Sequence, residues 1–367
     1  MTEHETYMKR ALELAEQARG YTSPNPMVGC VIVKDGRIIS EGYHERCGEY
    51  HAERNALLKC EEDPTGADLY VTLEPCCHYG KTPPCTDIII EKKIGRVFVG
   101  SMDCNPLVAG KGVSILREHG IEVTTGILEA ECLRLNEVFY HYMTTKTPFV
   151  VAKYAMTLDG KIACESGDAQ WVSSEESRHE VQLLRKYYAG IMVGIGTVLA
   201  DDPMLTCRIE EGMNPIRIIC DSKMRIPLES KIVQTAHQIP TILAVSEATA
   251  DPEQEMLLRE KGLEVLRVSE DENGEVDLKE LMRILGEPGI DSILLEGGGT
   301  LNASALRAGI VQKVQAYIAP KLVGGANAPT PVRGTGIERM ADALALNDLQ
   351  IDRVGEDIRV TGYLNHE

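Results

Sequence analysis

Residues 51 to 85 read HAERNALLKCEEDPTGADLYVTLEPCCHYGKTPPC, and this stretch decides the character of the first half of the chain. His51, Cys76 and Cys85 offer one imidazole and two thiolates, which are ligand types that suit Zn²⁺. Three protein ligands leave the fourth tetrahedral position open for water, as in catalytic zinc sites. Glu53 follows the histidine by two positions and can move protons beside the metal without binding it. The stretch therefore predicts hydrolytic deamination chemistry.

The spacing of the cysteines departs from the general pattern of zinc nucleobase deaminases. That pattern is His-x-Glu followed by Pro-Cys-x-x-Cys. Here Pro75-Cys76 fits, but the second cysteine, Cys85, lies nine positions after Cys76 rather than three. The match to the general pattern is partial.

A closed structural zinc site is the alternative reading of the same residues. Cys77 and His78 stand beside Cys76 and offer a fourth ligand. Consecutive side chains of an extended segment point to opposite sides, so Cys76 and Cys77 are not expected to face the same ion. We predict that Cys77 and His78 are bystanders. A single histidine or cysteine is more often packed than metal-bound, so the prediction rests on the three ligands together.

Length and composition bound the class of protein. A chain of 367 residues exceeds the size at which one core keeps growing, which predicts two domains. With 43% hydrophobic and 26% charged residues, no long apolar run and no leader pattern at Met1, we expect a cytoplasmic protein with no membrane partner. Eleven cysteines in such a chain are expected to stay reduced or to bind metal. The formal net charge of −18 disfavours a nucleic-acid partner and favours a small-molecule substrate.

Periodicity predicts an alternating order of helices and strands in the first half. Apolar residues at helical spacing indicate helices, short apolar runs indicate strands, and Lys34-Asp35-Gly36-Arg37 indicates a hairpin turn. The expected helices cover 5–19, 51–59, 110–119 and 129–142, and the expected strands cover 28–33, 38–42, 69–73, 95–101 and 121–126. Ligands at helix starts and strand ends are held by rigid elements.

The polar stretch Thr144–Pro148 predicts a boundary, with domains at residues 1–146 and 147–367. The second half again alternates, which favours a largely parallel sheet covered by helices on both faces. A helix capped by Ser173 or Ser174 is expected to reach about Tyr188. Further helices are expected at 253–261, 277–285 and 300–308, and strands at 149–155, 190–193, 215–220, 241–245, 264–268, 292–295 and 314–318.

Two glycine-containing segments of the second half are candidate phosphate sites. Leu294–Leu301 reads strand, glycine loop and helix start, a geometry that lets a phosphate approach backbone N–H groups. Gly194-Ile195-Gly196-Thr197, followed by Asp201-Asp202-Pro203, is the second candidate. A tight turn explains three glycines equally well, and neither segment has the spacing of a Rossmann or Walker A motif. The residues alone thus indicate only that a nucleotide or sugar phosphate can bind here.

Four stretches of the first half resemble the deaminase half of the bifunctional RibD family of riboflavin biosynthesis. They are SPNPMVG at 23–29, GYH at 42–44, HAE at 51–53 and EPCCHYGKTPPC at 74–85. The resemblance implies that His51, Cys76 and Cys85 bind one Zn²⁺, that Glu53 is the catalytic proton shuttle, and that Asn25 and His44 contact substrate. Two departures are Cys77, where the family often has serine, and Cys104, where it often has proline.

Other residues of the second half resemble the reductase half of the same family, whose fold is similar to dihydrofolate reductase. They are Lys153, Trp171, Arg185, GTVLADDP at 196–203, Arg208 and EGGG at 296–299. By resemblance, the expected NADPH contacts are Ala155, Trp171, Thr197, Asp201, Ser222, Gly298, Gly299, Thr300, Leu301, Asn302, Ala303 and Ser304. The expected substrate contacts are Lys153, Ala169, Arg185, Leu205, Arg208 and Glu296. A guanidinium can grip a ribose phosphate with paired hydrogen bonds, although an isolated arginine is more often a solvated charge.

The resemblance implies an α/β chain with an N-terminal cytidine-deaminase-like αβα layer domain and a C-terminal dihydrofolate-reductase-like domain. It implies zinc-dependent deamination of a phosphoribosylated pyrimidine and NADPH-dependent reduction of its ribosyl group, in a chain that we expect to be a homo-oligomer. One alternative is a deaminase whose second domain only binds or assembles; another is a nonenzymatic zinc-stabilised scaffold. Ser222, Lys223 and Arg225 follow an apolar strand and are candidates for holding an adenosine 2′-phosphate, unless the two cations merely solvate a turn.

Overall fold

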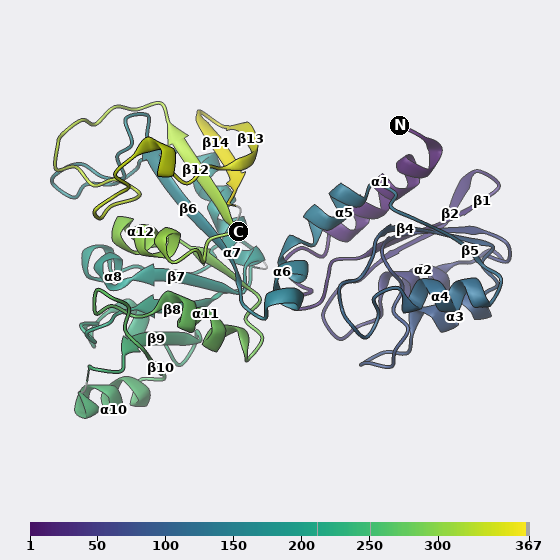
Figure 1. Ribbon diagram of the computed structural model, residues 1–367, viewed down its shortest axis with the longest axis horizontal. Helices are drawn as coiled ribbons and strands as arrows, with labels where there is room; N and C mark the ends of the chain where they lie inside the picture. Colours follow the sequence, from purple (N-terminus) through teal and green to yellow (C-terminus); the bar gives the residue numbers. More distant parts are fainter. Residues whose placement is uncertain (211, 250, 365–367) are drawn as a thin grey trace. The chain divides into compact units, whose positions relative to one another are not determined.

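The computed structural model describes residues 1–210, 212–249 and 251–364. The chain divides into two compact units, Met1–Lys146 (unit 1) and Thr147–Glu367 (unit 2). Each unit is described by itself, and Figure 1 labels their elements. Among the described residues, no helix is both long enough and apolar enough to cross a membrane.

Unit 1 is a five-stranded sheet in the order β2-β1-β3-β4-β5. Strand β1 is antiparallel to β2 and β3, while β3, β4 and β5 run parallel. The hairpin turn places Asp35 and Gly36 at positive φ (52° and 74°), as expected for a tight two-residue turn. The elements are α1 (Glu3–Glu16), β1 (Gly29–Lys34), β2 (Arg37–Tyr43), α2 (Ala52–Lys59), β3 (Asp68–Leu73), α3 (Cys85–Glu91), β4 (Arg96–Ser101), α4 (Lys111–Glu118), β5 (Glu122–Thr125), α5 (Glu129–Leu135) and α6 (Glu137–Thr145).

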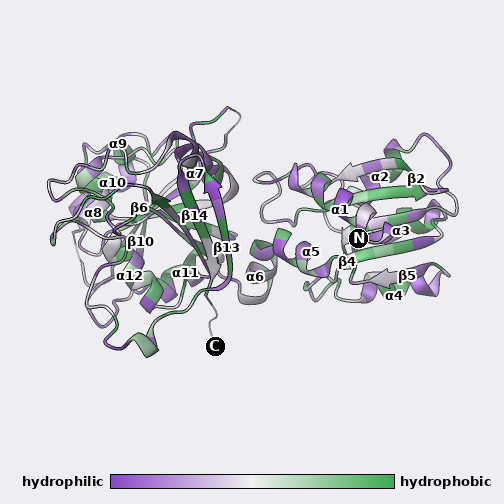
Figure 2. Cartoon of the chain, turned by 90° about the horizontal axis from the view of Figure 1, so that it is seen from above, coloured by the Kyte–Doolittle hydropathy of each residue, from purple (hydrophilic) through white to green (hydrophobic). Residues whose placement is uncertain are grey.

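Helices cover both faces of this sheet and make the expected αβα layers. On one face, apolar residues of α2, α3 and α4 pack on Ile32, Val71 and Val97. On the other face, α1 and α5 pack on Val31 and Phe98. Because side chains alternate along a strand, neighbouring residues such as 31 and 32 serve opposite layers. The strands read as apolar runs for this reason, and β4 is largely green in Figure 2.

The helix expected over 129–142 is divided in two at Asn136. Its backbone leaves the helical region (φ −109°, ψ 26°), and its buried side chain bonds to the backbone of Met27. Met27 N donates to Asn136 Oδ1 at 2.8 Å, and Asn136 Nδ2 donates to Met27 O at 2.9 Å. This contact bridges segments that are remote in sequence, so periodicity could not reveal the break.

Unit 2 has a nine-stranded sheet in the order β10-β9-β8-β7-β11-β6-β12-β14-β13. Neighbouring strands run parallel from β10 to β12, as predicted, and β14 and β13 then add an antiparallel hairpin. The elements are β6 (Phe149–Thr157), α7 (Glu175–Tyr187), β7 (Gly190–Gly194), α8 (Ile195–Asp201), β8 (Ile216–Cys220), α9 (Lys231–Gln234), β9 (Thr241–Ser246), α10 (Pro252–Glu260), β10 (Glu264–Val268), α11 (Leu278–Gly286), β11 (Ser292–Leu295), α12 (Gly299–Arg307), β12 (Lys313–Ala319), β13 (Asn347–Val354) and β14 (Asp357–Tyr363), with a short 3₁₀ turn at Met340–Asp342.

The two faces of the unit 2 sheet are covered by different helices. Residues of α11 and α12 pack on Met192, Ile218 and Ile293. Residues of α8, α9 and α10 pack on Ile191 and Ile219, which belong to the same strands. The predicted elements are present within one to three residues at most ends, and Ser174 is the cap of α7, accepting from Ser177 N at 3.2 Å. Periodicity missed α3, α8, α9 and the β13–β14 hairpin.

Candidate active sites

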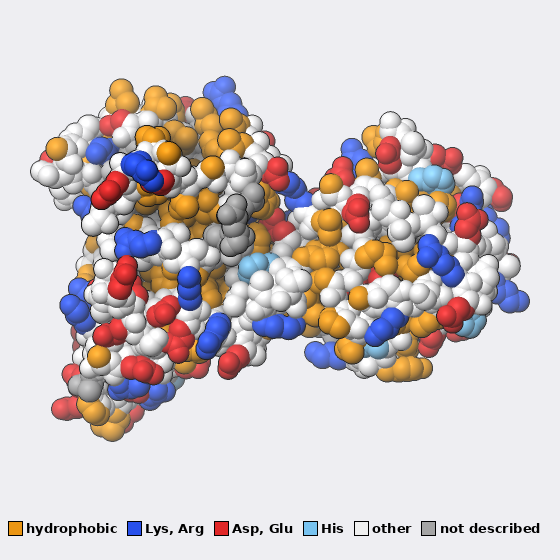
Figure 3. All heavy atoms as spheres, viewed as in Figure 1, with side chains coloured by type: hydrophobic (Ala, Val, Ile, Leu, Met, Phe, Trp, Pro, Cys, Tyr) orange, Lys and Arg blue, Asp and Glu red, His pale blue; other side chains and the backbone are white. Residues whose placement is uncertain are grey.

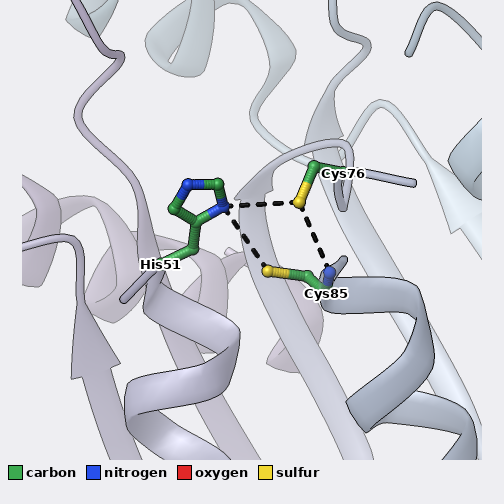
Figure 4. Close-up of side chains that lie close together, drawn as sticks. All are labelled: His51, Cys76 and Cys85. Carbon is green, nitrogen blue, oxygen red and sulfur yellow. Dashed lines mark hydrogen bonds between the residues drawn. The ribbon is translucent and has the colours of Figure 1, made fainter. Parts of the chain in front are cut away.

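Three elements bring the predicted metal ligands of unit 1 together. His51 is the residue immediately before α2, Cys76 follows β3, and Cys85 is the first residue of α3, a helix that the sequence did not predict. His51 was expected in the first turn of its helix and lies at the N-cap instead. Figure 4 shows the three side chains pointing toward one another. Rigid element ends therefore hold all three ligand atoms.

The distances between these atoms fit a zinc ion. The three ligand atoms lie within 4.8 Å of one another. Cys76 Sγ and Cys85 Sγ lie 3.4 Å and 3.6 Å from His51 Nδ1. Tetrahedral zinc, with Zn–S near 2.3 Å and Zn–N near 2.0 Å, requires sulfur-to-nitrogen separations of about 3.5 Å. The donor set and its spacing thus match the ion that the sequence predicts.

The neighbouring Cys77 is outside this ligand group. Its Sγ lies 3.7 Å from Leu107 O, and the grouping of metal-binding side chains within the described part of the chain includes neither Cys77 nor His78. His78 nevertheless lines the adjacent cavity, and its buried Nδ1 has no hydrogen-bond partner in the part of the chain that the structure describes. The geometry favours a three-ligand site over the closed four-ligand alternative.

Glu53 lies beside the ligands in the same cavity, whose volume is about 330 Å³. The residue is 3% exposed, and one carboxylate oxygen, Oε2, has no hydrogen-bond partner among the described residues. Burial raises the pKa of Glu53 to about 7, and the nearby Cys76 thiolate adds to the rise. A carboxyl group whose pKa lies near neutrality can both accept and donate a proton, which is the property of a proton shuttle.

The predicted substrate contacts of unit 1 line the same cavity. Asn25 Nδ2 lies 3.2 Å from His44 Nε2, and His44 Nδ1 lies 3.0 Å from Tyr50 O. A carbonyl can only accept, so Nδ1 carries the proton and Nε2 accepts from the amide of Asn25. Burial lowers the pKa of His44, which keeps this ring neutral. The pair is therefore oriented before any ligand binds.

Glu74 is a residue that the sequence analysis quoted without assigning a role. Its buried carboxylate accepts from the backbone N–H groups of Asp103, Gly110 and Val113 at 3.3, 2.9 and 3.2 Å. These bonds fix the 103–113 segment, which contributes Asp103 to the cavity wall. The signal that could have found it is its position, two residues before a ligand at the end of a buried strand.

In unit 2, three of the predicted substrate residues form a largely buried ionic triad, with side-chain exposures of 12% for Lys153, 13% for Arg185 and 9% for Glu296. Lys153 comes from β6, Arg185 from α7, and Glu296 follows β11. Glu296 accepts from Arg185 Nε and Nη2 at 2.7 and 3.0 Å, and it pairs with Lys153 Nζ at 3.1 Å. Burial alone would raise the pKa of Glu296, but Lys153 and Arg185 hold it at about 2. The triad keeps a net formal charge of +1.

Most hydrogen-bond donors of Arg185 are already used within the protein, whereas its expected role, paired hydrogen bonds to a substrate phosphate, needs available donors. Besides gripping Glu296, it donates from Nη1 to Thr206 O at 3.0 Å. A guanidinium occupied in this way can contribute charge to a bound phosphate but has few donors left for paired hydrogen bonds. Lys153 is the triad cation with the simpler set of partners.

The glycine loop after Glu296 forms the start of α12. Gly298 is its N-cap without a side-chain cap, and a Cβ built on it would lie 3.4 Å from Thr197 Oγ1. A Cβ on Gly299 would lie 2.4 Å from Thr330 O, so only glycine fits there. Arg333 N donates to Gly299 O at 3.0 Å, and its side chain packs beside Gly299. Thr197, the loop and Arg333 therefore lie together, and the sequence offered no signal for Arg333.

Ser222 does not present a free hydroxyl to a ligand. It is 6% exposed, donates to Glu275, and accepts from Val276 N at 3.1 Å. Lys223 and Arg225 are exposed, and Arg225 Nε lies 3.6 Å from Asp221. Of the three residues expected to face a 2′-phosphate, the two cations remain the accessible ones.

The other predicted residues of unit 2 differ in how they could meet a ligand. Trp171 is 60% exposed with the Arg178 guanidinium 4.8 Å from its ring centroid. Leu205 is buried, with its backbone at φ 53°. Exposed positions are Ala169, Asp201, Arg208 and Thr300; half-buried ones are Ala155, Leu301 and Ser304; Asn302 and Ala303 are buried.

Comparison with known proteins covers both units. The family model for the RibD C-terminal domain matches residues 148–360, and the model for the cytidine and deoxycytidylate deaminase zinc-binding region matches residues 1–101. The riboflavin biosynthesis protein RibD of Actinobacillus pleuropneumoniae is 54% identical over 353 residues, covering 96% of this chain and 93% of that protein. The chain belongs to the RibD family.

Other RibD relatives agree along nearly the full length. RibD of Escherichia coli is 41% identical, covering 96% of this chain and 97% of that protein. The crystal structure of a diaminohydroxyphosphoribosylaminopyrimidine deaminase/5-amino-6-(5-phosphoribosylamino)uracil reductase from Thermotoga maritima is 38% identical, with a TM-score of 0.86 and 99% of both chains covered. The prediction of a bifunctional deaminase and reductase of riboflavin biosynthesis, using zinc and NADPH, is confirmed at the level of the family.

Proposed function

We propose that residues 1–146 deaminate 2,5-diamino-6-(5-phosphoribosylamino)pyrimidin-4-one, and that residues 147–367 reduce the ribosyl group of the product to ribityl. The observation that carries the first half is the meeting of His51, Cys76 and Cys85 with Glu53 beside one cavity. The Thermotoga maritima relative is named for a deaminase and a reductase activity of the same kind.

The residues of unit 1 divide the work of deamination. Zinc, when bound by the three ligands, supplies the polarisation that makes water a nucleophile at neutral pH. Glu53 takes one proton of the attacking water and delivers it to the ring nitrogen, and it then carries the second proton, from the newly added hydroxyl, to the departing amine, so that ammonia leaves and a carbonyl remains. Asn25 and the neutral His44 hold the substrate in the cavity through a pair already fixed by Tyr50 O. Preorganisation of this kind lowers the cost of reaching the reactive geometry.

In unit 2, the triad and the glycine loop take separate parts of the reaction. NADPH, when bound, supplies the hydride. The N–H groups at the start of α12, with Thr197 beside them, suit the cofactor's phosphates because the positive end of a helix favours anions. The Lys153–Glu296–Arg185 triad offers a net positive, buried group to the phosphorylated substrate. An alternative in which unit 2 only binds or assembles predicts no oxidation of NADPH on supplied deaminated intermediate.

Metal analysis combined with an ammonia assay tests the deaminase assignment. Cys85→Ser should lose both zinc and ammonia release, because it replaces a thiolate ligand with a hydroxyl that binds zinc weakly. Cys77→Ser is the matched control and should keep both, since its sulfur contacts Leu107 O instead of the ligand group. Full zinc occupancy in Cys85→Ser would remove that residue from the ligand set.

We further propose that the chain acts as a homo-oligomer. Strand β13 is the edge of the nine-stranded sheet. The β13–β14 hairpin exposes Leu349, Ile351 and Ile358 (57%, 70% and 44%), and Figure 3 shows apolar side chains gathered over this part of unit 2. Exposed apolar groups on an edge hairpin favour pairing with another chain. Ile351→Lys should lower the mass measured by sedimentation, and an unchanged mass would place the interface elsewhere.

The proposed setting is the cytoplasm, with a small phosphorylated pyrimidine rather than nucleic acid as the partner. All eleven cysteines lie in the described part of the chain and none of them forms a disulfide there, which suits a reducing compartment. The net charge of −18 opposes binding to a phosphate backbone. Localisation of a tagged chain by fractionation tests the first statement.

A further inference from the structure

The segment Met204–Arg208, here the 204–208 segment, carries two of the expected substrate residues, Leu205 and Arg208. It has no regular secondary structure. The Leu205 side chain packs in a hydrophobic core cluster, and polar contacts from two elements hold the backbone around it. Arg185 of α7 donates to Thr206 O at 3.0 Å, and Gln182 of the same helix accepts from Arg208 N at 2.9 Å through Oε1.

The start of the segment is held by Arg217, a residue of β8 that no motif singled out. Its Nη1 donates to Met204 O at 3.4 Å. Arg217 is 0% exposed, and its side chain is the largest of the fully buried ones among residues 1–210, 212–249 and 251–364. Within the described part of the chain it has no carboxylate partner, which is unusual for a buried cation.

Neutral oxygens satisfy the rest of this guanidinium. Nε and Nη2 donate to Thr241 Oγ1 at 2.9 and 2.7 Å, and Nη1 donates to Thr235 Oγ1 at 2.8 Å. Nη2 also donates to the carbonyls of Ile232 and Ile239 at 3.0 and 3.2 Å. These bonds fix the planar group in one orientation, so Met204 O meets a donor whose position cannot adjust.

Leu205 shows why the segment needs to be held. Its φ of 53° lies in the left-handed region, which a branched side chain without a local polar group rarely occupies. The carbonyls on both sides of it, Met204 O and Thr206 O, are the ones that accept from Arg217 and Arg185. Two guanidinium groups thus bracket one strained residue. Arg185 in turn grips Glu296, which links the segment to the triad.

We propose that Arg217 is a positioning residue of the reductase, which fixes the 204–208 segment so that Leu205, Arg208 and the Arg185–Glu296 pair are in place for the phosphorylated substrate. It acts through Met204 O and not by touching substrate or cofactor. The inference rests on the proposed reductase function of unit 2. It assigns a role in substrate recognition to a residue buried in the sheet.

Steady-state kinetics of the full chain test the proposal. Arg217→Lys keeps the charge but loses the fixed fork of donors, so the contact with Met204 O should be lost while the bonds to threonine remain possible. The KM for the deaminated intermediate should rise about tenfold or more, since small displacements of positioning groups are costly. The KM for NADPH, the zinc content and ammonia release should stay unchanged.

Two further variants keep the proposal falsifiable if Arg217→Lys folds poorly. Gln182→Ala releases the other end of the segment and should raise the same KM with the same sparing of NADPH. Arg259→Lys is the matched control, because Arg259 also ties a helix to a strand through a carbonyl, Val265 O, at 2.7 Å, but it lies on α10 and does not contact the segment. It should change neither KM.

The outcomes separate this inference from the proposed function. A wild-type chain that never oxidises NADPH on the intermediate overturns the reductase function itself. If the wild type is active and Arg217→Lys and Gln182→Ala both keep a normal KM for the intermediate, the positioning role is wrong. A penalty on NADPH as large as that on the intermediate would also overturn it, because it would show general damage to unit 2.

Discussion

The predicted metal ligands of unit 1 all lie between residues 51 and 85, whereas the triad of unit 2 comes from residues 153, 185 and 296. In unit 1, the residue types and their spacing indicate a metal site, because one histidine and two cysteines in such a pattern are typical of zinc binding. In unit 2, a lysine, an arginine and a glutamate are residue types that usually lie on the surface, and only the tertiary structure brings these three together in a largely buried position. The difference teaches that a metal site can be read locally, while an ionic site depends on tertiary structure.

The largest expected effect tests whether the site of unit 1 depends on the Glu53 carboxylate. Glu53→Gln should keep stoichiometric zinc but slow ammonia release by about 10²–10⁴-fold, because it removes the proton shuttle and spares the ligands. Zinc analysis and an ammonia assay check both halves of this statement. NADPH oxidation on supplied intermediate should remain, as Glu53 lies in unit 1. Near-normal turnover would show that another group moves the proton.

What the sequence could predict follows the same division. The grouping of His51, Cys76 and Cys85, the place of Glu53 beside them and most strands were predictable because their signals are local. The break at Asn136 depends on Met27, more than a hundred positions away, so no local pattern marks it. The hydrogen bond that the Ser222 hydroxyl donates to Glu275 is likewise a contact between distant segments. Resemblance named the triad residues but not their mutual pairing, and neither route indicated Arg217.

The second prediction tests whether the Lys153–Glu296–Arg185 triad also stabilises unit 2. Glu296→Gln leaves Lys153 and Arg185 as two buried cations without a carboxylate, which should cost about 3–5 kcal/mol of the free energy of unfolding of unit 2. Reductase activity should fall as well. Trp171 is the single tryptophan of the chain and lies in unit 2, so its fluorescence in urea follows this unit. Deaminase activity provides the internal control.

The difference in the free energy of unfolding between wild type and Glu296→Gln should depend on pH, and the pKa of Glu296 gives the direction. The pKa of Glu296 is held at about 2, below its ordinary value of 4.5, so its contribution to stability is complete above about pH 4.5 and is lost as the pH falls toward 2. The gap between wild type and Glu296→Gln should therefore be level from pH 8 to about pH 5 and shrink below that. A gap that shrinks already near neutrality would mean that the carboxylate is not strongly paired.

The smallest expected effect concerns the exposed cations Lys223 and Arg225, which are compared with the neighbouring buried Ser222. Replacing Lys223 and Arg225 by Ala should raise the KM for NADPH about three- to tenfold, as expected for exposed charges. It should leave the KM for NADH nearly unchanged, because NADH has no 2′-phosphate to pair with them.

Ser222→Ala is the contrasting variant. The Ser222 hydroxyl is hydrogen-bonded to Glu275 and Val276, so its loss should lower the stability of unit 2 more than it lowers cofactor affinity. Kinetics with each cofactor varied in turn decide the matter. An equal penalty on NADPH and NADH in the double variant would rule out the 2′-phosphate site, and a selective NADPH defect in Ser222→Ala would show that the hydroxyl leaves Glu275 when the cofactor binds.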